Sequence, residues 1–164
     1  MPDCHPAPPS FPQGTLLIAP AERLDWVHVG RRLVPLTLTA PEVWTRVMSR
    51  PLPGMGLAFW LRDAISSWFG VRRIGGFSRR PQVPVLGGRL DFFTVEAVSD
   101  SVLALTERDR HLEVMACITA TPAPGGTDVA ITGSVRLRSR FGRVYMIPVG
   151  PAHRLIVWLM LRRL

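Results

Sequence analysis

The central part of the chain alternates apolar and polar positions. From residue 91 to residue 140, apolar side chains recur at every second position, which is typical of strands with one buried face. Turn-forming residues interrupt the alternation at 99–100, 108–109 and 122–126. The pattern therefore predicts four antiparallel strands, at residues 91–98, 101–107, 110–120 and 128–140.

A strand and two short helices are predicted before this region. Val27, Val29 and Leu33 fall on one side of an extended chain, which indicates a first strand at residues 25–34. Thr39 and Glu42 have the spacing of a capping box, with Pro41 in the first turn, so a helix is expected to begin there. Its predicted buried stripe is Val43, Trp44, Val47 and Met48. Apolar residues at helical spacing predict a second helix from Gly56 to Phe69, closed by Gly70.

The chain is predicted to end in an apolar helix. A short fifth piece of the meander, Arg143 to Ile147, is expected to lead through Pro148 into a helix with Pro151 at its first position. Residues 155–161 are apolar on every side, which predicts an enclosed helix. The side chains expected to be largely buried against the sheet are Leu155, Ile156, Trp158 and Leu159.

Residues 1–20 contain prolines at positions 2, 6, 8, 9 and 12 and no hydrophobic period. They are interpreted as a flexible tail or as an arm laid over the domain, and are excluded from the predicted fold. Residues 21–164 are expected to form a single domain, since a chain of 164 residues can bury one core without a disulfide or a metal.

Composition and charge exclude several classes of protein. The chain is 47% hydrophobic and carries a formal charge of +8, but its 20 basic residues are all arginines spread from Arg23 to Arg163. A nucleic-acid-binding protein concentrates basic residues on one face, so no nucleic-acid partner is predicted. Cys4 and Cys117 lie in unlike settings and predict no disulfide. The N-terminal apolar stretch is too short for a signal peptide, and the longest apolar run is too short to span a membrane. These features favour a cytoplasmic protein with no stable membrane insertion; a homodimer is left open.

These elements predict an α+β fold in which a curved antiparallel sheet wraps the long C-terminal helix around an apolar cavity. The order of strand, two helices, meander and C-terminal helix resembles the START-like helix-grip fold, also called the SRPBCC superfamily. More narrowly, the sequence is similar to the bacterial family known as domain of unknown function 2867 (DUF2867). The residues that carry this similarity are Trp60-Leu61-Arg62-Asp63, Trp68-Phe69-Gly70-Val71, Asp109-Arg110-His111-Leu112-Glu113, Phe141-Gly142-Arg143-Val144-Tyr145 and Pro151-Ala152-His153-Arg154-Leu155-Ile156-Val157.

The resemblance implies a fold and a cavity but no single activity, because the superfamily includes lipid carriers, hormone receptors, polyketide cyclases and small-molecule lyases. The cavity is expected to be lined by one face of the third and fourth strands of the meander, together with the last helix. The expected ligand-binding residues are Leu112, Val114, Ala116, Val135, Leu137, Arg154 and Trp158.

Four polar side chains are candidates for catalysis. Glu96 would be a base if burial in the cavity raised its pKa, and His111 lies two residues from Glu113, close enough for an acid/base pair. The alternative for His111 and Glu113 is the outer face of the sheet, beside strand arginines. Tyr145 and His153 lie near the start of the last helix, where they could contact a polar end of a ligand or only pack and cap the helix.

Phosphate-binding loops, metal-ligand spacings and nucleophile elbows are absent from the sequence, and no cofactor is predicted. Three functions remain open. The favoured one is binding of a small, mostly hydrophobic molecule. The second is a cofactor-independent cyclase, lyase or isomerase, and the third is a lipid-binding protein that rests on an anionic membrane surface.

Overall fold

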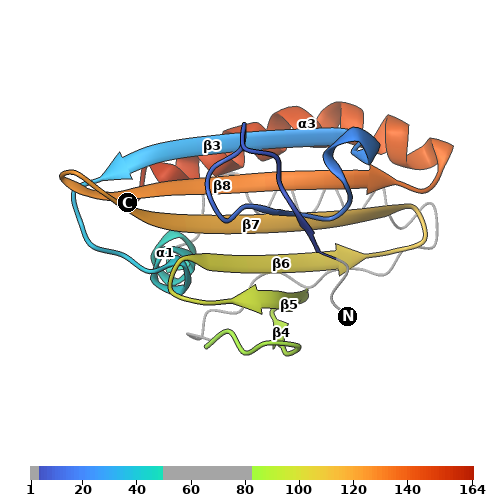
Figure 1. The fold of residues 1–164 in the computed structure, drawn as a ribbon. Coiled ribbons are helices and arrows are strands. Elements are labelled where there is room, and N and C mark those ends of the chain that lie inside the picture. The colour runs from blue at the N-terminus through green and yellow to red at the C-terminus, as the bar shows by residue number, and fades with distance from the viewer. Residues whose placement is uncertain (1–3, 50–82) are drawn as a thin grey trace.

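The structure, a computed structural model, describes residues 4–49 and 83–164 (Figure 1). The predicted helix at residues 56–69 and two of the five segments that carry the family resemblance lie outside the described residues.

A curved six-stranded antiparallel sheet forms the centre of the described fold (Figure 1). Its strands are arranged in the order β3-β8-β7-β6-β5-β4, so β3 and β4 are the edges. The bounds are β3 Trp26–Val34, β4 Arg89–Leu90, β5 Phe93–Val98, β6 Val102–Arg108, β7 Leu112–Ala123 and β8 Gly126–Leu137. The predicted strand at 25–34 and the four-stranded meander are confirmed, with ends that differ by a few residues.

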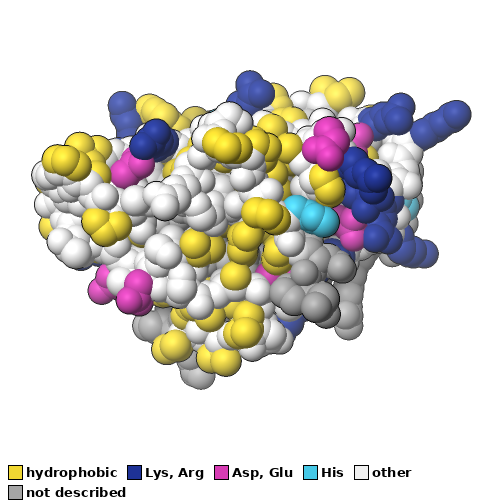
Figure 2. Space-filling view, in the orientation of Figure 1, with side chains coloured by type: hydrophobic (Ala, Val, Ile, Leu, Met, Phe, Trp, Pro, Cys, Tyr) yellow, Lys and Arg dark blue, Asp and Glu magenta, His cyan; other side chains and the backbone are white. Residues whose placement is uncertain are grey.

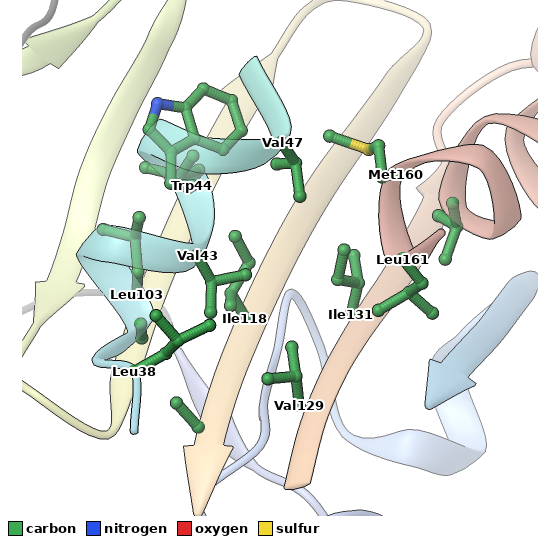
Figure 3. Close-up of a cluster of buried hydrophobic side chains, with 14 of the residues drawn as sticks. Leu38, Val43, Trp44, Val47, Leu103, Ile118, Val129, Ile131, Met160 and Leu161 are labelled. Atoms are coloured by element: carbon green, nitrogen blue, oxygen red, sulfur yellow. The ribbon is translucent and has the colours of Figure 1, made fainter. Parts of the chain in front are cut away.

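One face of the sheet carries two helices, α1 (Ala40–Met48) and α3 (Arg140–Leu161), both of which pack on the strands. The predicted capping box is present at α1, because the Thr39 hydroxyl accepts from the Glu42 amide while the Glu42 carboxylate accepts from the Thr39 amide. In Figure 3, side chains from α1 and α3 meet the central strands from two sides. The buried residues drawn there include Val43, Val47, Ile118, Ile131, Met160 and Leu161.

Helix α3 is longer than the sequence predicts. It begins at Arg140, after the Ser139 hydroxyl accepts a hydrogen bond from the Gly142 amide, and it continues through Pro148 and Pro151. The expected strand-like piece at 143–147 and the helix start at Pro151 are therefore wrong. Both prolines, and the residues four positions before each, Val144 and Ile147, lie on the exposed side of the helix. Water can bind the carbonyls that the prolines leave without a donor, which lowers the cost of proline in a helix.

The enclosure expected for α3 is found on one side only. Val157, Met160 and Leu161 are buried in the core, and Ile156 and Leu159 are packed against it. Leu155 and Trp158 instead retain 56% and 48% of their accessible surface, so the expectation that they are buried is wrong. By length and composition alone, the helix at residues 142–161 is long and apolar enough to cross a membrane. The expectation from the sequence rests only on the longest unbroken apolar run, which is much shorter.

The close approach of α3 decides which side of β3 faces the core. A Cβ atom on Gly30 would lie 2.5 Å from Val157 Cγ1, so the helix packs directly on the glycine. His28 lies on the same helix-facing side, two residues away. Val27, Val29 and Leu33 lie on the outer side and are exposed. The apolar alternation correctly predicts a strand, but its apolar side is the outer one.

The N-terminal segment belongs to the fold. Residues 4–24, here called the N-terminal arm, contain a small hairpin of β1 (His5–Pro6) and β2 (Leu16–Leu17) and the short helix η1 (Ala21–Arg23). The arm crosses the outer face of the sheet (Figure 1), where the amide of Leu16 donates to Cys117 Sγ over 3.3 Å. Leu17 is fully buried. The structure therefore supports the second of the two interpretations, an arm laid over the domain. The exclusion of residues 1–20 from the predicted fold is wrong for residues 4–20.

Candidate functional site

The helix-facing side of β7 and β8 carries the five apolar residues expected to line a cavity. Alternation places them on this side, since Leu112 pairs with Leu137, Val114 with Val135, and Ala116 with Gly133. We call Leu112, Val114, Ala116, Val135 and Leu137 the apolar floor. Four of the five remain half-buried, although β7 and β8 are interior strands; Val135 is buried. Apolar surface on two interior strands thus stays accessible on the helix-facing side of the sheet.

Two aromatic residues extend the apolar floor onto β3. Trp26 pairs with Val135 and His28 pairs with Gly133, so both lie in the same cross-strand rows as the floor. His153 reaches the same place from α3: a Cβ atom on Gly133 would lie 2.6 Å from its Cε1 atom. Its ring meets Trp26 edge-on at 5.1 Å between centroids, and lies 6.2 Å from His28. These three residues form the Trp26–His28–His153 cluster.

One ring nitrogen of each imidazole in this cluster is buried without a hydrogen-bond partner. Within the part of the chain that the structure describes, the buried Nδ1 atoms of His28 and His153 have none. Burial, followed by the neighbouring His28, lowers the pKa of His153 to about 4. Burial, followed by the positive charge of Arg154, also lowers the pKa of His28. Both rings are therefore neutral at pH 7, and each can hydrogen bond to a polar group placed next to it.

The other candidate residues on α3 are divided between its two sides. Tyr145 is half-buried in the first half of the helix. Arg154 and Trp158 lie on the exposed side, and the guanidinium of Arg162 stacks over the Trp158 ring at 3.9 Å. The structure thus brings His153 to the apolar floor, whereas Arg154 and Trp158 face away from it.

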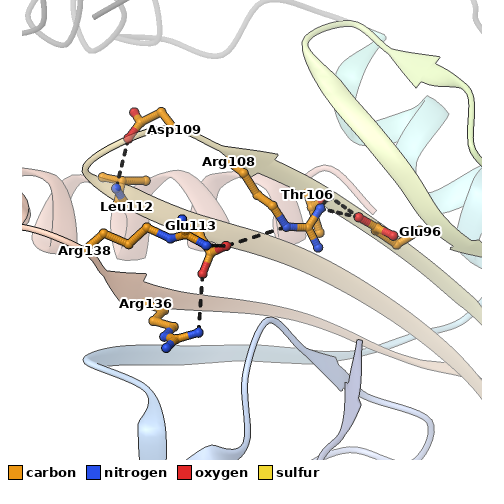
Figure 4. Close-up of polar contacts among 8 residues, drawn as sticks. All are labelled: Glu96, Thr106, Arg108, Asp109, Leu112, Glu113, Arg136 and Arg138. Atoms are coloured by element: carbon orange, nitrogen blue, oxygen red, sulfur yellow. Dashed lines mark hydrogen bonds and ion pairs between the residues drawn. The ribbon is translucent and has the colours of Figure 1, made fainter. Parts of the chain in front are cut away.

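Glu96 lies on the outer face of the sheet, away from the apolar floor. A bulge between Val95 and Ala97 breaks the alternation of β5, so Val95 and Val98 both pack on the helix-facing core while Ala97 packs on the outer cluster. The Glu96 carboxylate accepts hydrogen bonds from Arg108 and Thr106 (Figure 4). Burial alone raises the pKa of this carboxyl, but these hydrogen bonds outweigh it and hold the pKa below its usual value. A carboxylate stabilised in this way is a poor base.

Glu113 and His111 have structural partners at the same end of the sheet. Glu113 accepts a hydrogen bond from Arg138 and lies 3.8 and 3.9 Å from the guanidinium groups of Arg136 and Arg108 (Figure 4). Glu113 thus lies on the outer face of the sheet beside strand arginines, which is the alternative given in the sequence analysis. His111 Nδ1 lies 3.1 Å from the hydroxyl of Ser139, the residue that caps α3. Each of the two residues therefore has a structural partner of its own.

Trp26 and His28 are the site residues that the sequence analysis missed. The alternation indicated that His28 and Val29 point to opposite sides, but a polar residue on a strand is ordinarily assigned to solvent. The signal that could have identified them is Gly30, a glycine inside a strand, which often marks the close approach of another element.

In the described ranges 4–49 and 83–164, no group of three or more His, Cys, Asp or Glu side chains is arranged to hold a metal ion.

The described fold defines an α+β protein built on one six-stranded antiparallel sheet with a long C-terminal helix. The sequence profile of a family described as "Protein of unknown function (DUF2867)" matches residues 20–160, and the chain belongs to this family. Among solved structures, it is similar to the crystal structure of protein MLL2253 from Mesorhizobium loti, with 16% identity and a TM-score of 0.45. That match covers 84% of this chain and 96% of the other. No curated protein matches the chain significantly.

Proposed function

We propose that the protein binds a small, mostly hydrophobic molecule on the apolar floor, as a cytoplasmic binding protein or carrier with a START-like, helix-grip architecture. The observation that carries the proposal is the half-buried state of Leu112, Val114, Ala116 and Leu137 on interior strands. Side chains at such positions are ordinarily fully buried, so accessible apolar surface there favours a ligand that completes the core.

The Trp26–His28–His153 cluster would bind the polar end of such a ligand. Two neutral imidazoles with buried, unpartnered Nδ1 atoms lie beside the apolar floor. A buried polar atom without a partner is unfavourable, and a ligand hydroxyl or carbonyl would remove that cost. The expected ligand is therefore apolar over most of its surface and carries one or two hydrogen-bonding groups.

The same histidine pair favours a second function, a cofactor-independent cyclase, lyase or isomerase. A neutral imidazole N–H can donate a hydrogen bond to a substrate oxygen and stabilise the negative charge that develops there during the reaction. Of the four residues considered catalytic from the sequence, His153 is the one that the structure brings to this cluster. His153→Gln should then abolish turnover while binding remains, whereas a carrier would show no turnover in either form.

The test is titration of the protein with N-phenyl-1-naphthylamine, a neutral fluorescent probe for apolar sites. We expect saturable binding to the native protein and an affinity at least about tenfold weaker in Leu112→Trp or Ala116→Trp, whose indoles would occupy the floor. Leu33→Trp, on the exposed outer side of β3, is the matched control and should bind like the native protein. Unchanged affinity in both floor variants, with folding confirmed by circular dichroism, would contradict the proposal.

A further inference from the structure

The side of α3 that faces away from the sheet is apolar and basic along its whole length. The exposed residues of the helix recur at three- and four-residue spacing and define one stripe, which we call the outer face of α3. Its members are Arg140, Arg143, Val144, Ile147, Pro148, Pro151, Arg154, Leu155 and Trp158, with Arg162 directly after the helix. Val144 and Ile147 retain 64% and 72% of their accessible surface. Large apolar side chains this exposed, in one continuous stripe, indicate a surface that another body covers.

The charge on this face has one sign. Residues 140–164 contain no aspartate or glutamate. Within the described part of the chain, the exposed arginines at 140, 143, 154 and 162 form no ion pairs, unlike Arg108, Arg136 and Arg138 on the sheet. The outer face of α3 is thus complementary to an anionic surface, and no carboxylate among the described residues neutralises its arginines.

The geometry fits a bilayer surface better than a membrane crossing. Residues 142–161 are long and apolar enough to span a membrane, but Val157, Met160 and Leu161 are buried against the sheet, so one side of the helix is already occupied. A helix with a covered side and an exposed apolar and basic side can lie in the plane of the interface. Trp158, with Arg162 stacked on it at 3.9 Å, combines an apolar ring with a cation, a pair suited to the headgroup region.

We propose that the outer face of α3 docks the protein on an anionic lipid bilayer. Val144, Ile147, Leu155 and Trp158 enter the boundary between headgroups and acyl chains, and the arginines bind lipid phosphates. In Figure 1, α3 and the N-terminal arm lie on opposite sides of the sheet, so docking leaves the arm in solution. The proposal goes beyond ligand binding, because it uses the side of α3 opposite the apolar floor.

The experiment is cosedimentation of the full chain with vesicles of equal parts phosphatidylcholine and phosphatidylglycerol, compared with vesicles of phosphatidylcholine alone. We expect binding to the anionic vesicles, weak or no binding to the neutral ones, and release at high salt. Each arginine near an anionic surface contributes about a fivefold factor to partitioning, so Arg140→Glu with Arg143→Glu should weaken binding at least about 25-fold. Ile147→Ser with Leu155→Ser should also weaken it, with less effect on its salt dependence.

The matched control is Arg23→Glu with Arg89→Glu, which makes the same change in net charge on η1 and on the opposite edge strand β4. The affinity of this control for anionic vesicles should be within a few-fold of that of the native chain, because the fivefold factor applies only to arginines near the bilayer surface. Equal losses in the control pair and the α3 pair would show a response to net charge alone and would overturn the proposal.

Absence of sedimentation with anionic vesicles, or equal binding to both vesicle types, would also overturn it. So would a dimer in size-exclusion chromatography that the α3 variants convert to monomers without any vesicle binding, since the face would then join two copies. If a variant fails to fold, the native chain on the two vesicle types decides the outcome. Leu112→Trp should bind vesicles normally, so this test and the probe titration can fail independently.

Discussion

His153 is a neutral imidazole held against Gly133, Trp26 and His28, and the positive charge of Arg154 acts on His28. Its pKa of about 4 in the folded protein lies below the ordinary value of 6.5, so the unfolded chain binds a proton that the folded chain excludes. Above about pH 6.5 His153 is neutral in both states, and as the pH falls towards 4 the unfolded state alone gains a proton, so the free energy of unfolding decreases.

We therefore expect the free energy of unfolding to decrease by roughly 3 kcal/mol between pH 6.5 and pH 4 because of this residue. Urea titrations across this range, with His153→Gln as the comparison, measure the effect. The variant should be less stable at neutral pH but should lose less stability on acidification. Parallel pH profiles for the two proteins would contradict the buried neutral imidazole.

Glu113 is a second residue whose environment gives a direct prediction. Its side chain keeps only 8% of its accessible surface and contacts Arg108, Arg136 and Arg138. Glu113→Gln removes the charge from this group and should lower the free energy of unfolding by about 2 kcal/mol. Asp128→Asn, which breaks the ion pair with the largely exposed Arg31, should have a much smaller effect in the same denaturant titration. Equal losses would mean that burial does not distinguish the two carboxylates.

At the level of elements, the packing of α3 on β3 depends on Gly30. An added Cβ atom would lie 2.5 Å from Val157 Cγ1 and 2.9 Å from Leu161 Cδ1. Gly30→Ala should therefore destabilise the protein by about 1–3 kcal/mol through overpacking. Val157→Ala in the same chain makes room for the methyl group, so the double variant should lose less stability than the two single variants added together. Additive losses, measured by thermal denaturation, would show that the two positions are not in contact.

The N-terminal arm protects Cys117 on the outer face of the sheet. The thiol is buried, the Leu16 amide donates to it, and burial raises its pKa to about 11. In a Cys4→Ser background, Cys117 should react with a disulfide reagent at pH 8 only when the arm opens. Removing residues 1–19 should speed this reaction by at least about tenfold. Similar rates with and without the arm would contradict its placement over the sheet.

For the whole molecule, one core joins both helices to the sheet. The buried cluster includes residues of α1, α3 and every strand from β3 to β8, with Met160 and Leu161 opposite Val43 and Val47 (Figure 3). Removing residues 140–164 would expose this cluster, and the remainder should lose its cooperative thermal transition in calorimetry. A sharp transition in the shortened chain would show that α3 is not part of the cooperative unit.

The sequence by itself determined the elements whose signals are local. Alternation identified β6, β7 and β8 and placed Leu112, Val114, Ala116, Val135 and Leu137 on one side, because strand side chains alternate strictly where no bulge intervenes. The capping box at Thr39 fixed the start of α1, since both of its hydrogen bonds join residues three apart. The apolar floor was predictable for this reason, and the family was recognised from its motifs.

Only the tertiary structure decided which partner each face meets. The bulge beside Glu96 reversed the alternation of β5, and the prolines of α3 are tolerated because the helix turns them towards solvent. His28 faces the core because α3 packs on Gly30, and the N-terminal arm is ordered by the outer face of a sheet that forms far along the chain. Such choices depend on contacts between distant residues, whereas a sequence period records only which residues share a side.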